Sequence, residues 1–384
     1  MRFPEFNGEW ETKLINDLAV VIGGGTPDTT IKSYWDGEIQ WFTPSEIGKN
    51  KYVDSSLRTI TEEGLNNSSA KLLPPNTILL SSRATIGECS LSLRECATNQ
   101  GFQSLVSKKC YVDFLYYLIQ TKKRDLIRKS CGSTFLEISA NEVRKIQVSV
   151  PTDVEQQKIA GLLSLIDERI ATQNKIIEKP QSLIKGLSQQ LLSSENDWIL
   201  YRLDDLAQIK SGYSGTQVSY QTPYKVSRIE TISKHCIDIQ RIGYVECIPE
   251  SYRLNVGNIL FSNINSIQYI GNTAYLDKDY GLYHGMNLLR IIPNTTIVRP
   301  RFLHLLLCTD WAINHFQTIC NKAVSQASIN QTALGKSRFP IPPMSVQQQI
   351  CSMFELTERK LDNEQEYISC LQQQKRYLLQ KMFI

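Results

Sequence analysis

Two stretches, PTDVEQQKIAGLLSLIDERI at residues 151–170 and PPMSVQQQICSMFELTERKL at residues 342–361, decide the fold of this chain. Each begins with proline, which ends the preceding element, and continues with the apolar spacing of an amphipathic helix. Thr152 with Glu155, and Ser345 with Gln348, have the spacing of a capping box. We therefore expect one long helix to begin at each stretch.

Both expected helices carry apolar residues every seven positions, which is typical of a coiled coil. At about 1.5 Å per residue, helices of about 40 residues span roughly 60 Å, so an antiparallel pair is the simplest way to bury both seams. The alternative is that each helix packs on its own globular domain. Thr357, Glu364 and Lys375 interrupt the second seam, and Pro180 predicts a kink or restart near residues 178–181. The predicted seam consists of Leu163, Ile170, Ile177, Ile184 and Leu191 in the first helix and of Phe354, Leu361 and Ile368 in the second.

The chain repeats one plan twice. ILLS at residues 78–81 recurs as ILFS at 259–262, and EQQKI at 155–159 recurs as VQQQI at 346–350, in the same order. Further pairs in that order are Trp10 and Trp198, Ile86-Gly87 and Ile270-Gly271, and Gly101 and Gly285. The repeat predicts an α+β protein with two related α/β domains and an internal pseudo-two-fold relation.

The expected domain boundaries follow from this repeat. The first domain covers residues 1–151 and is followed by a helix over 152–196, and the second covers 197–342 and is followed by a helix over 343–384. Inside the domains, short apolar runs between Gly, Pro, Asn and Asp turns predict strands, for example at residues 77–80 and 258–261. Apolar stretches at residues 112–127 and 301–319 predict a helix in each domain.

The composition excludes several protein classes. The formal net charge is +4, so any nucleic-acid surface must be local. Ten cysteines form no CxxC motif and four histidines form no HExxH motif, so we expect no structural metal. No apolar run reaches the roughly 18 residues of a membrane helix, and MRFPEFNGEW lacks the pattern of a signal peptide. We expect a cytoplasmic protein without a membrane segment.

The sequence motifs favour binding over catalysis. The chain has no GxGxxG, no P-loop and no GxSxG nucleophile elbow, and the glycines at 23–25 are followed by a Thr-Pro turn. Neither Pro-Pro pair, at 74–75 or 342–343, has the flanking residues with which amino-methylating DNA enzymes hold a flipped base. Two related domains on long helices suit bivalent binding to a linear target such as DNA. A coiled-coil scaffold that binds proteins and no DNA is the alternative function, and a self-sufficient methyltransferase is a third.

Several motifs together resemble the specificity subunit of type I restriction-modification systems, the HsdS family. The similar motifs in the first domain are GGGTPDT at 23–29, YWDGEIQWFTPSEI at 34–47, SSRATIG at 81–87 and TNQGFQSL at 98–105. In the second domain they are FSNINS at 261–266 and HGMNLLRI at 284–291, and the two helical stretches resemble the family's conserved helical regions. The resemblance covers essentially the whole chain.

The resemblance implies a non-catalytic, cytoplasmic subunit whose two target recognition domains each read one half of a bipartite, asymmetric site in double-stranded DNA. It implies that the helices set the spacer and dock two adenine-N6 methyltransferase subunits, which two restriction and translocase subunits then join. S-adenosylmethionine, ATP and magnesium would be used by those partner subunits, so this chain is expected to bind no cofactor.

Candidate DNA contacts are Lys and Arg side chains for phosphates and amides for base edges. In the first domain they are Arg83, Asn99, Gln100, Lys122, Lys123, Arg124, Arg128, Lys129 and Thr134. In the second domain they are Lys210, Tyr213, Lys225, Arg228, Asn263, Asn265 and Gln268. The basic run at 122–129 also fits a solvated helix end, Arg83 also fits an ion pair with a carboxylate, and the amides also fit turns. Trp35, Trp41 and His284 fit a core or turn position better than a ligand site.

Four glutamines at the helix starts, Gln156, Gln157, Gln347 and Gln348, are the candidate contacts to the methyltransferase partner. The alternative is that these amides only cap their helices.

Overall fold

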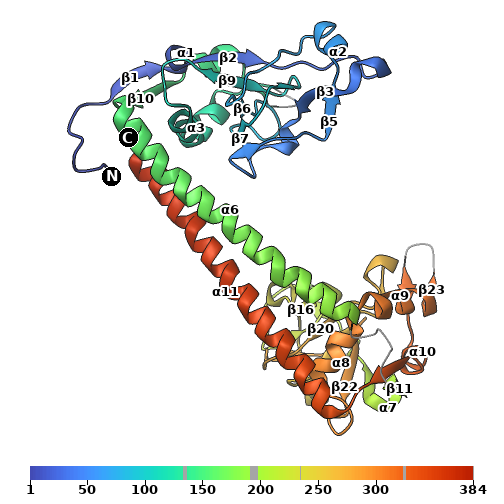
Figure 1. The fold of residues 1–384 in the computed structure, drawn as a ribbon. Coiled ribbons are helices and arrows are strands. Elements are labelled where there is room, and N and C mark those ends of the chain that lie inside the picture. The colour runs from blue at the N-terminus through green and yellow to red at the C-terminus, as the bar shows by residue number, and fades with distance from the viewer. Residues whose placement is uncertain (133–135, 191–197, 234, 323–325, 384) are drawn as a thin grey trace. The chain divides into compact units, whose positions relative to one another are not determined.

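The computed structural model describes residues 1–132, 136–190, 198–233, 235–322 and 326–383 (Figure 1). The chain divides into two compact units, Met1–Ile176 with Glu364–Ile384, and Ile177–Asn363. Each unit contains one globular domain and a part of each of the two long helices, α6 (Asp153–Gln190) and α11 (Met344–Met382). Within the described ranges, no helix is both long and apolar enough to cross a membrane.

The first unit is built on two sheets. The larger has the strand order β2-β9-β6-β7-β4 and is antiparallel except for the pair β4 and β7. The smaller has the order β5-β3-β8, and β1 pairs separately with β10 next to the start of α6. The strands are β1 (Glu11–Leu14), β2 (Ala19–Gly23), β3 (Trp35–Phe42), β4 (Tyr52–Val53), β5 (Arg58–Ile60), β6 (Ile78–Leu80), β7 (Cys89–Ser92), β8 (Cys96–Thr98), β9 (Gln103–Ser107) and β10 (Gln147–Val150). The short helices are α1 (Ile15–Leu18), α2 (Glu62–Asn66), α3 (Val112–Thr121), α4 (Lys123–Arg128) and α5 (Ala140–Arg144).

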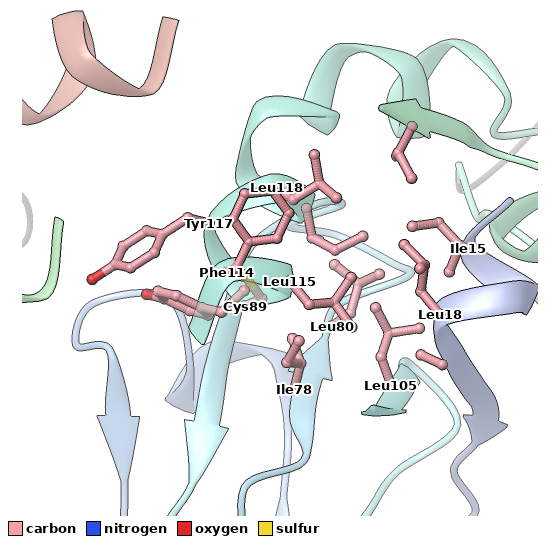
Figure 2. Close-up of a cluster of buried hydrophobic side chains, with 14 of the residues drawn as sticks. Ile15, Leu18, Ile78, Leu80, Cys89, Leu105, Phe114, Leu115, Tyr117 and Leu118 are labelled. Carbon is pink, nitrogen blue, oxygen red and sulfur yellow. The ribbon is translucent and has the colours of Figure 1, made fainter. Parts of the chain in front are cut away.

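Helix α3 covers the larger sheet and forms the core of the first unit with it. Its buried side chains share that core with β6 and β9: Leu115 lies beside Leu80 of β6, and Ile15 of α1 closes one side (Figure 2). Phe114 and Ile15 are fully buried, and burying such a side chain stabilises the fold by about 1.5–3 kcal/mol. The core continues into α6 and the last turns of α11, so the unit's helices are held by its globular domain.

The second unit repeats this architecture. Its main sheet has the order β12-β22-β18-β20, which matches β2-β9-β6-β7, and β11 pairs with β25 as β1 pairs with β10. A second sheet has the order β13-β17-β14-β21, and the small sheet β15-β16 has no counterpart among the described strands of the first unit. In the place of β19-β24-β23, the first unit has isolated bridges of Glu137 with Arg83 and Cys131. The strands are β11 (Ile199–Arg202), β12 (Ala207–Ser211), β13 (Gln217–Val218), β14 (Tyr224–Val226), β15 (Ile232–Ser233), β16 (Cys236–Ile237), β17 (Gly243–Val245), β18 (Ile259–Phe261), β19 (Ile264–Asn265), β20 (Thr273–Tyr275), β21 (Leu282–Tyr283), β22 (Leu289–Pro293), β23 (Asn321–Lys322), β24 (Ala327–Ser328) and β25 (Arg338–Ile341). The helices are α7 (Leu203–Leu206), α8 (Pro300–Leu307), α9 (Asp310–Ile319) and α10 (Gln331–Gly335).

Two glycines show how closely the copies agree. Gly87 and Gly271 have φ angles of 85° and 84° in the turns after β6 and β18. Their amides donate to the carbonyl oxygens of Ser81 and Ser262 at 3.1 and 3.0 Å. This positive φ is strained for residues with a Cβ, which explains glycine at both places.

One pairing of the predicted repeat is wrong. Gly24 and Gly212 each lie against the backbone of another segment of the same chain. A Cβ at Gly24 would lie 2.0 Å from the carbonyl oxygen of Asn99, and a Cβ at Gly212 would lie 1.8 Å from that of Gly285. Gly285 therefore takes the place of Asn99, and not that of Gly101, because the connecting loops differ in length.

The long helices run antiparallel. In the first unit, Leu378 and Met382 at the end of α11 share a core with Ile159 and Leu163 at the start of α6. In the second unit, Phe354 near the start of α11 shares a core with Ile184 near the end of α6. The antiparallel coiled coil is thus confirmed, and each helix also packs on its own domain, so the two expected arrangements coexist.

The predicted seam residues lie inward along these helices. Leu163, Ile177 and Phe354 are buried, and those that are half-buried are Ile170, Ile184, Leu361 and Ile368. Leu191 lies outside the described residues. The helix α6 continues without a break through Pro180, so no restart occurs there.

Polar interruptions of the seam make contacts between the two helices. The Gln173 amide donates to the Glu364 carboxylate, and Lys375 Nζ lies 2.6 Å from Asp167 Oδ1. Thr357 instead donates to the carbonyl oxygen of Met353 at 2.7 Å in its own helix. A polar pair in an apolar seam is satisfied in only one alignment, so these pairs favour one register.

The predicted capping boxes are not the way in which the helices begin. Ser345 lies inside α11, which begins at Met344, and the Gln348 amide donates to Ser352 Oγ. The Glu155 carboxylate accepts two hydrogen bonds of 2.7 Å from the Arg2 guanidinium. The predicted helices at 112–127 and 301–319 are each divided, into α3 and α4 and into α8 and α9. The second of these stretches is interrupted between α8 and α9. There the Thr309 hydroxyl caps α9 by accepting a hydrogen bond from the Ala312 amide.

Candidate nucleic-acid interface

The basic run at 122–129 forms α4 and its two flanking residues, and only some of its cations are paired with carboxylates. Lys123 pairs with Glu88, Arg128 lies 3.5 Å from Asp125, and Lys129 lies 3.9 Å from Glu142. Lys122 and Arg124 have no ion pair within the described part of the chain. These two cations are therefore the members of the run that are most available to phosphates. Thr134 lies outside the described residues.

Lys122, Lys123 and Arg124 line a cleft of about 730 Å³ between α4 and the last turns of α11, within the first unit. The other residues that line it are Leu118, Gln120, Thr121, Ile127, Arg376, Leu379, Gln380 and Phe383. A second cleft of about 510 Å³ shares Gln120, Lys123, Arg376 and Leu379 with it and adds Lys49, Lys51 and Lys375. Sequence reasoning missed Lys49, Lys51, Lys375 and Arg376 because they lie far along the chain from α4.

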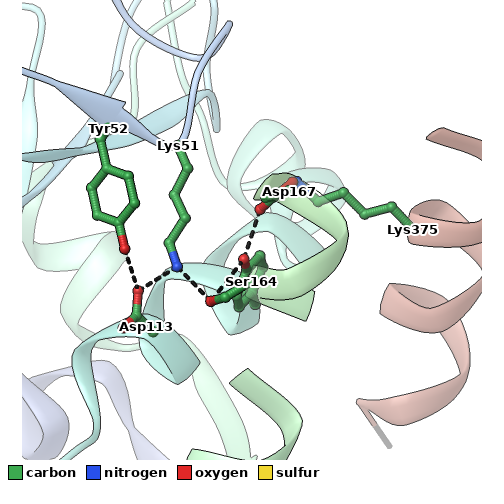
Figure 3. Close-up of polar contacts among 7 residues, drawn as sticks. Lys51, Tyr52, Asp113, Ser164, Asp167 and Lys375 are labelled. Atoms are coloured by element: carbon green, nitrogen blue, oxygen red, sulfur yellow. Dashed lines mark hydrogen bonds and ion pairs between the residues drawn. The ribbon is translucent and has the colours of Figure 1, made fainter. Parts of the chain in front are cut away.

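Lys51 belongs to a polar network that joins the globular domain to both long helices (Figure 3). Its Nζ lies 2.5 Å from Asp113 Oδ1 and donates to Ser164 Oγ at 2.7 Å. In the same network Asp167 accepts from the Tyr117 hydroxyl at 2.6 Å and pairs with Lys375. Burial and the Asp167 carboxylate keep the pKa of Tyr117 well above its usual value, so the phenol stays protonated and keeps donating. This network holds the first domain at a set place on its helices.

The remaining first-domain candidates have partners inside the domain. Arg83 Nη2 lies 2.8 Å from Glu137 Oε2, so Arg83 forms the ion pair that was the alternative to a DNA contact. Asn99 Oδ1 accepts from the Gly101 amide at 2.8 Å in a turn, and the Gln100 side chain accepts from Thr26. Arg83 and Gln100 remain partly or fully exposed, whereas the Asn99 carbonyl is committed to its turn.

Trp35 and Trp41 are core residues. Both indoles are buried, with ring centroids 5.1 Å apart, and Arg58 stacks on the Trp35 ring at 3.5 Å. Neither ring has an exposed face to offer to a base.

In the second domain, the glycine-rich turn after β12 brings only some of the candidates together. Arg228 lines a cleft of about 380 Å³ and lies 3.4 Å from Glu230, which also lines it. Tyr213 packs edge to face on Tyr252 at 5.3 Å, so its ring supports the loop. Lys210 and Lys225 are exposed on strands β12 and β14.

The amides that follow β18 are used in the structure of the loop. Asn263 Nδ2 donates to the carbonyl oxygen of Ile329 at 3.3 Å, and Asn265 accepts from the Ser266 amide at 2.8 Å. Gln268 alone of the three is exposed. Asn263 Oδ1 is buried without a partner among the described residues.

Gln156 and Gln347 do not meet the expectation of a partner contact. Gln347 is 0% exposed, and its Oε1 accepts from the Arg299 amide at 2.8 Å while its Nε2 donates to the carbonyl oxygens of Pro342 and Ile297 at 2.9 and 3.1 Å. Gln156 does the same in the first unit with the Tyr111 amide and the carbonyl oxygen of Pro151, both at 2.9 Å. These buried amides tie each long helix to its own domain, so only the exposed Gln157 and Gln348 remain open to a partner.

Burial holds several titratable side chains in their neutral forms. Burial raises the pKa of Cys89, Cys96, Cys110 and Cys308 to about 12, so these thiols are protonated at neutral pH. His284 is buried with Nε2 2.9 Å from the carbonyl oxygen of Leu288, which is a structural contact. No group of three or more His, Cys, Asp or Glu side chains in the described ranges is placed to hold a metal ion.

Two copies of one domain, each tied to a long helix and each with its own surface side chains, define an internally duplicated two-domain protein. A family model described as the type I restriction modification DNA specificity domain matches residues 7–179 and 195–373. The chain therefore belongs to the family of type I restriction-modification DNA specificity proteins.

Known relatives agree with this assignment. The type I restriction enzyme MjaIX specificity subunit of Methanocaldococcus jannaschii is 30% identical in an alignment 327 residues long, which covers 72% of this chain and 75% of that protein. The EcoR124I/EcoR124II specificity subunit of Escherichia coli is 29% identical in an alignment 210 residues long, which covers 53% of this chain and 49% of that protein. The crystal structure of the S subunit of a type I system from M. genitalium is similar in fold, with a TM-score of 0.60 and 16% identity over 100% of this chain and 99% of that one. A chain from a structural study of type I complex assembly has a TM-score of 0.63 and 14% identity over 98% of both chains.

Proposed function

We propose that this chain is the DNA specificity subunit of a type I restriction-modification complex and that each globular domain reads one half of a bipartite, asymmetric DNA site. The observation that carries the proposal is the repeat of one sheet order, β2-β9-β6-β7 and β12-β22-β18-β20, in domains whose connecting loops differ in sequence. A shared framework with different loops suits two readers of different sequences, since base contacts come from loop side chains and not from the framework.

The partners in this proposal are two adenine-N6 methyltransferase subunits and two restriction and translocase subunits. S-adenosylmethionine, ATP and magnesium are used by those subunits, while this chain supplies sequence choice and no catalytic group. The long helices set the spacing between the half-sites.

Repeated exposed residues on the long helices support docking of two copies of one partner. Leu165 is 60% exposed and Leu356 is 65% exposed, and each lies ten residues after the corresponding positions 155 and 346 of the repeat. The exposed glutamines Gln157 and Gln348 correspond in the same way. A single exposed leucine is common on a protein surface, so the support comes from its recurrence at the matching place of both helices.

The test is to co-express the chain with its methyltransferase subunit and to map methylated adenines in the host genome. We expect one split motif with a gap of fixed length, and exchange of one globular domain should change only one half of the motif. A complex that assembles and binds no DNA would favour the protein-scaffold alternative. Leu165→Asp and Leu356→Asp should each reduce co-purification of the methyltransferase. Gln365→Asp is the control, because Gln365 is exposed on the opposite side of α11 from Leu356.

A further inference from the structure

The adjoining clefts between α4 and α11 carry more positive charge than their carboxylates neutralise. The acidic residues that line them are Glu88 and Asp167, and these pair with Lys123 and Lys375. Lys51 also lines them and is neutralised by Asp113. The cations left without an ion pair within the described ranges are Lys49, Lys122, Arg124 and Arg376.

Like charges around one concavity repel each other, and an anion in the cleft would relieve this repulsion. The larger cleft has no acidic side chain among its described lining residues, and Gln120 and Gln380 add amide donors at its wall. Leu379 and Phe383 make one side of this cleft apolar, and a lower local dielectric constant on that side strengthens charge interactions there.

The cations follow two connected clefts and do not converge on one point. Lys49 lines one cleft, Lys122 and Arg124 line the other, and Arg376 lines both. A small anion would occupy one such place, whereas a chain of phosphates presents charge at regular intervals along its length. The arrangement therefore favours a nucleic-acid backbone over a free phosphate.

The second unit does not repeat this feature. Its helix α9, DWAINHFQTI, stands in the place of α4 and contains no Lys or Arg. The charge is thus not a property of the shared framework and distinguishes the first unit.

We infer that these clefts bind the phosphate backbone of the DNA and that Arg376, on the coiled coil, takes part together with Lys122 and Arg124 of the recognition domain. The inference rests on the proposed function and adds to it that the end of α11 is part of the DNA-binding surface. Because phosphates are the same at every base pair, these contacts strengthen binding without changing which sequence is read. They act on the side of the first recognition domain only.

The experiment compares two double variants of the chain in complex with its methyltransferase subunits. Arg124→Gln with Arg376→Gln removes two unpaired cations of the clefts. Arg359→Gln with Lys360→Gln is the matched control, because these residues are exposed on α11 outside the clefts and carry the same charge. Binding is measured over a series of salt concentrations on a duplex with the methylated motif and on a duplex without it.

Each lost phosphate contact should reduce the slope of log K against log salt by about 0.9, so the cleft variant should lose about 1.8. At about 0.1 M salt this corresponds to roughly eightfold weaker binding for each contact, equally on both duplexes. The methylated motif should stay the same, and the control should keep the parent slope.

An unchanged slope in a cleft variant that still binds and methylates DNA would overturn this inference and leave the proposed function intact. Loss of complex assembly in the cleft variant alone would also overturn it, because the clefts would then be a protein interface. Failure of the parent complex to bind or methylate DNA would instead count against the proposed function.

Discussion

Replacement of Gln347 by leucine tests whether the buried glutamine joins α11 to the second domain. Leucine has a similar volume, so no large cavity arises, but three hydrogen bonds are lost. One amide, that of Arg299, and two carbonyls, those of Ile297 and Pro342, lose their partner. An unsatisfied buried polar group costs about 1–3 kcal/mol, and one of these bonds is fully buried while two are partly buried. We expect the free energy of unfolding to fall by about 3 kcal/mol.

The assay is urea unfolding of the isolated chain, followed by circular dichroism, with Gln348→Leu as the control. Gln348 is the next residue on the same helix and is exposed, so its replacement should change the free energy of unfolding by no more than about 0.5 kcal/mol. Equal stability of the two variants would refute the reasoning. If Gln347→Leu kept its stability and lost only the methyltransferase, the residue would be a partner contact after all.

Three further expectations follow from the same structure. Gly271→Ala should destabilise the chain by more than Gly281→Ala in thermal unfolding. Both residues have positive φ, which costs an alanine about 1–2 kcal/mol, but only at Gly271 would the new Cβ also lie 2.6 Å from Cδ2 of Phe316. Equal losses of stability in the two variants would contradict this. Phe354→Ala should cost about 3–5 kcal/mol in urea unfolding because the ring is 1% exposed in the core, and a loss below about 1 kcal/mol would show that the core closes around the gap. Burial lowers the pKa of His284 from its ordinary 6.5 to about 4, so below pH 6.5 the unfolded state binds a proton that the folded state does not. The free energy of unfolding should therefore fall by about 3 kcal/mol as the pH drops from 6.5 to 4. His284→Asn should make this pH dependence shallower, and an unchanged slope would mean that the imidazole is accessible.

The sequence alone determined the large-scale plan of this protein. Helix and repeat signals are local: heptad spacing, proline boundaries and the recurrence of ILLS as ILFS or EQQKI as VQQQI require no knowledge of distant contacts. They predicted two related domains and an antiparallel pair of long helices, and they located β6 and β18 to within one residue. The same reasoning located the basic run of α4 as a charged surface.

Only the tertiary structure decided which of these side chains remain available. Lys123 is paired because folding brings Glu88 to it, and Arg376 joins α4 although it lies some 250 positions further along the chain. Gln156 and Gln157 are adjacent in sequence and chemically identical, yet one is buried and the other exposed, since successive helix positions face different directions. Charge pairing and burial depend on distances between residues remote in sequence, and such distances are set by the packing of whole elements and leave no local pattern for a reader of the sequence.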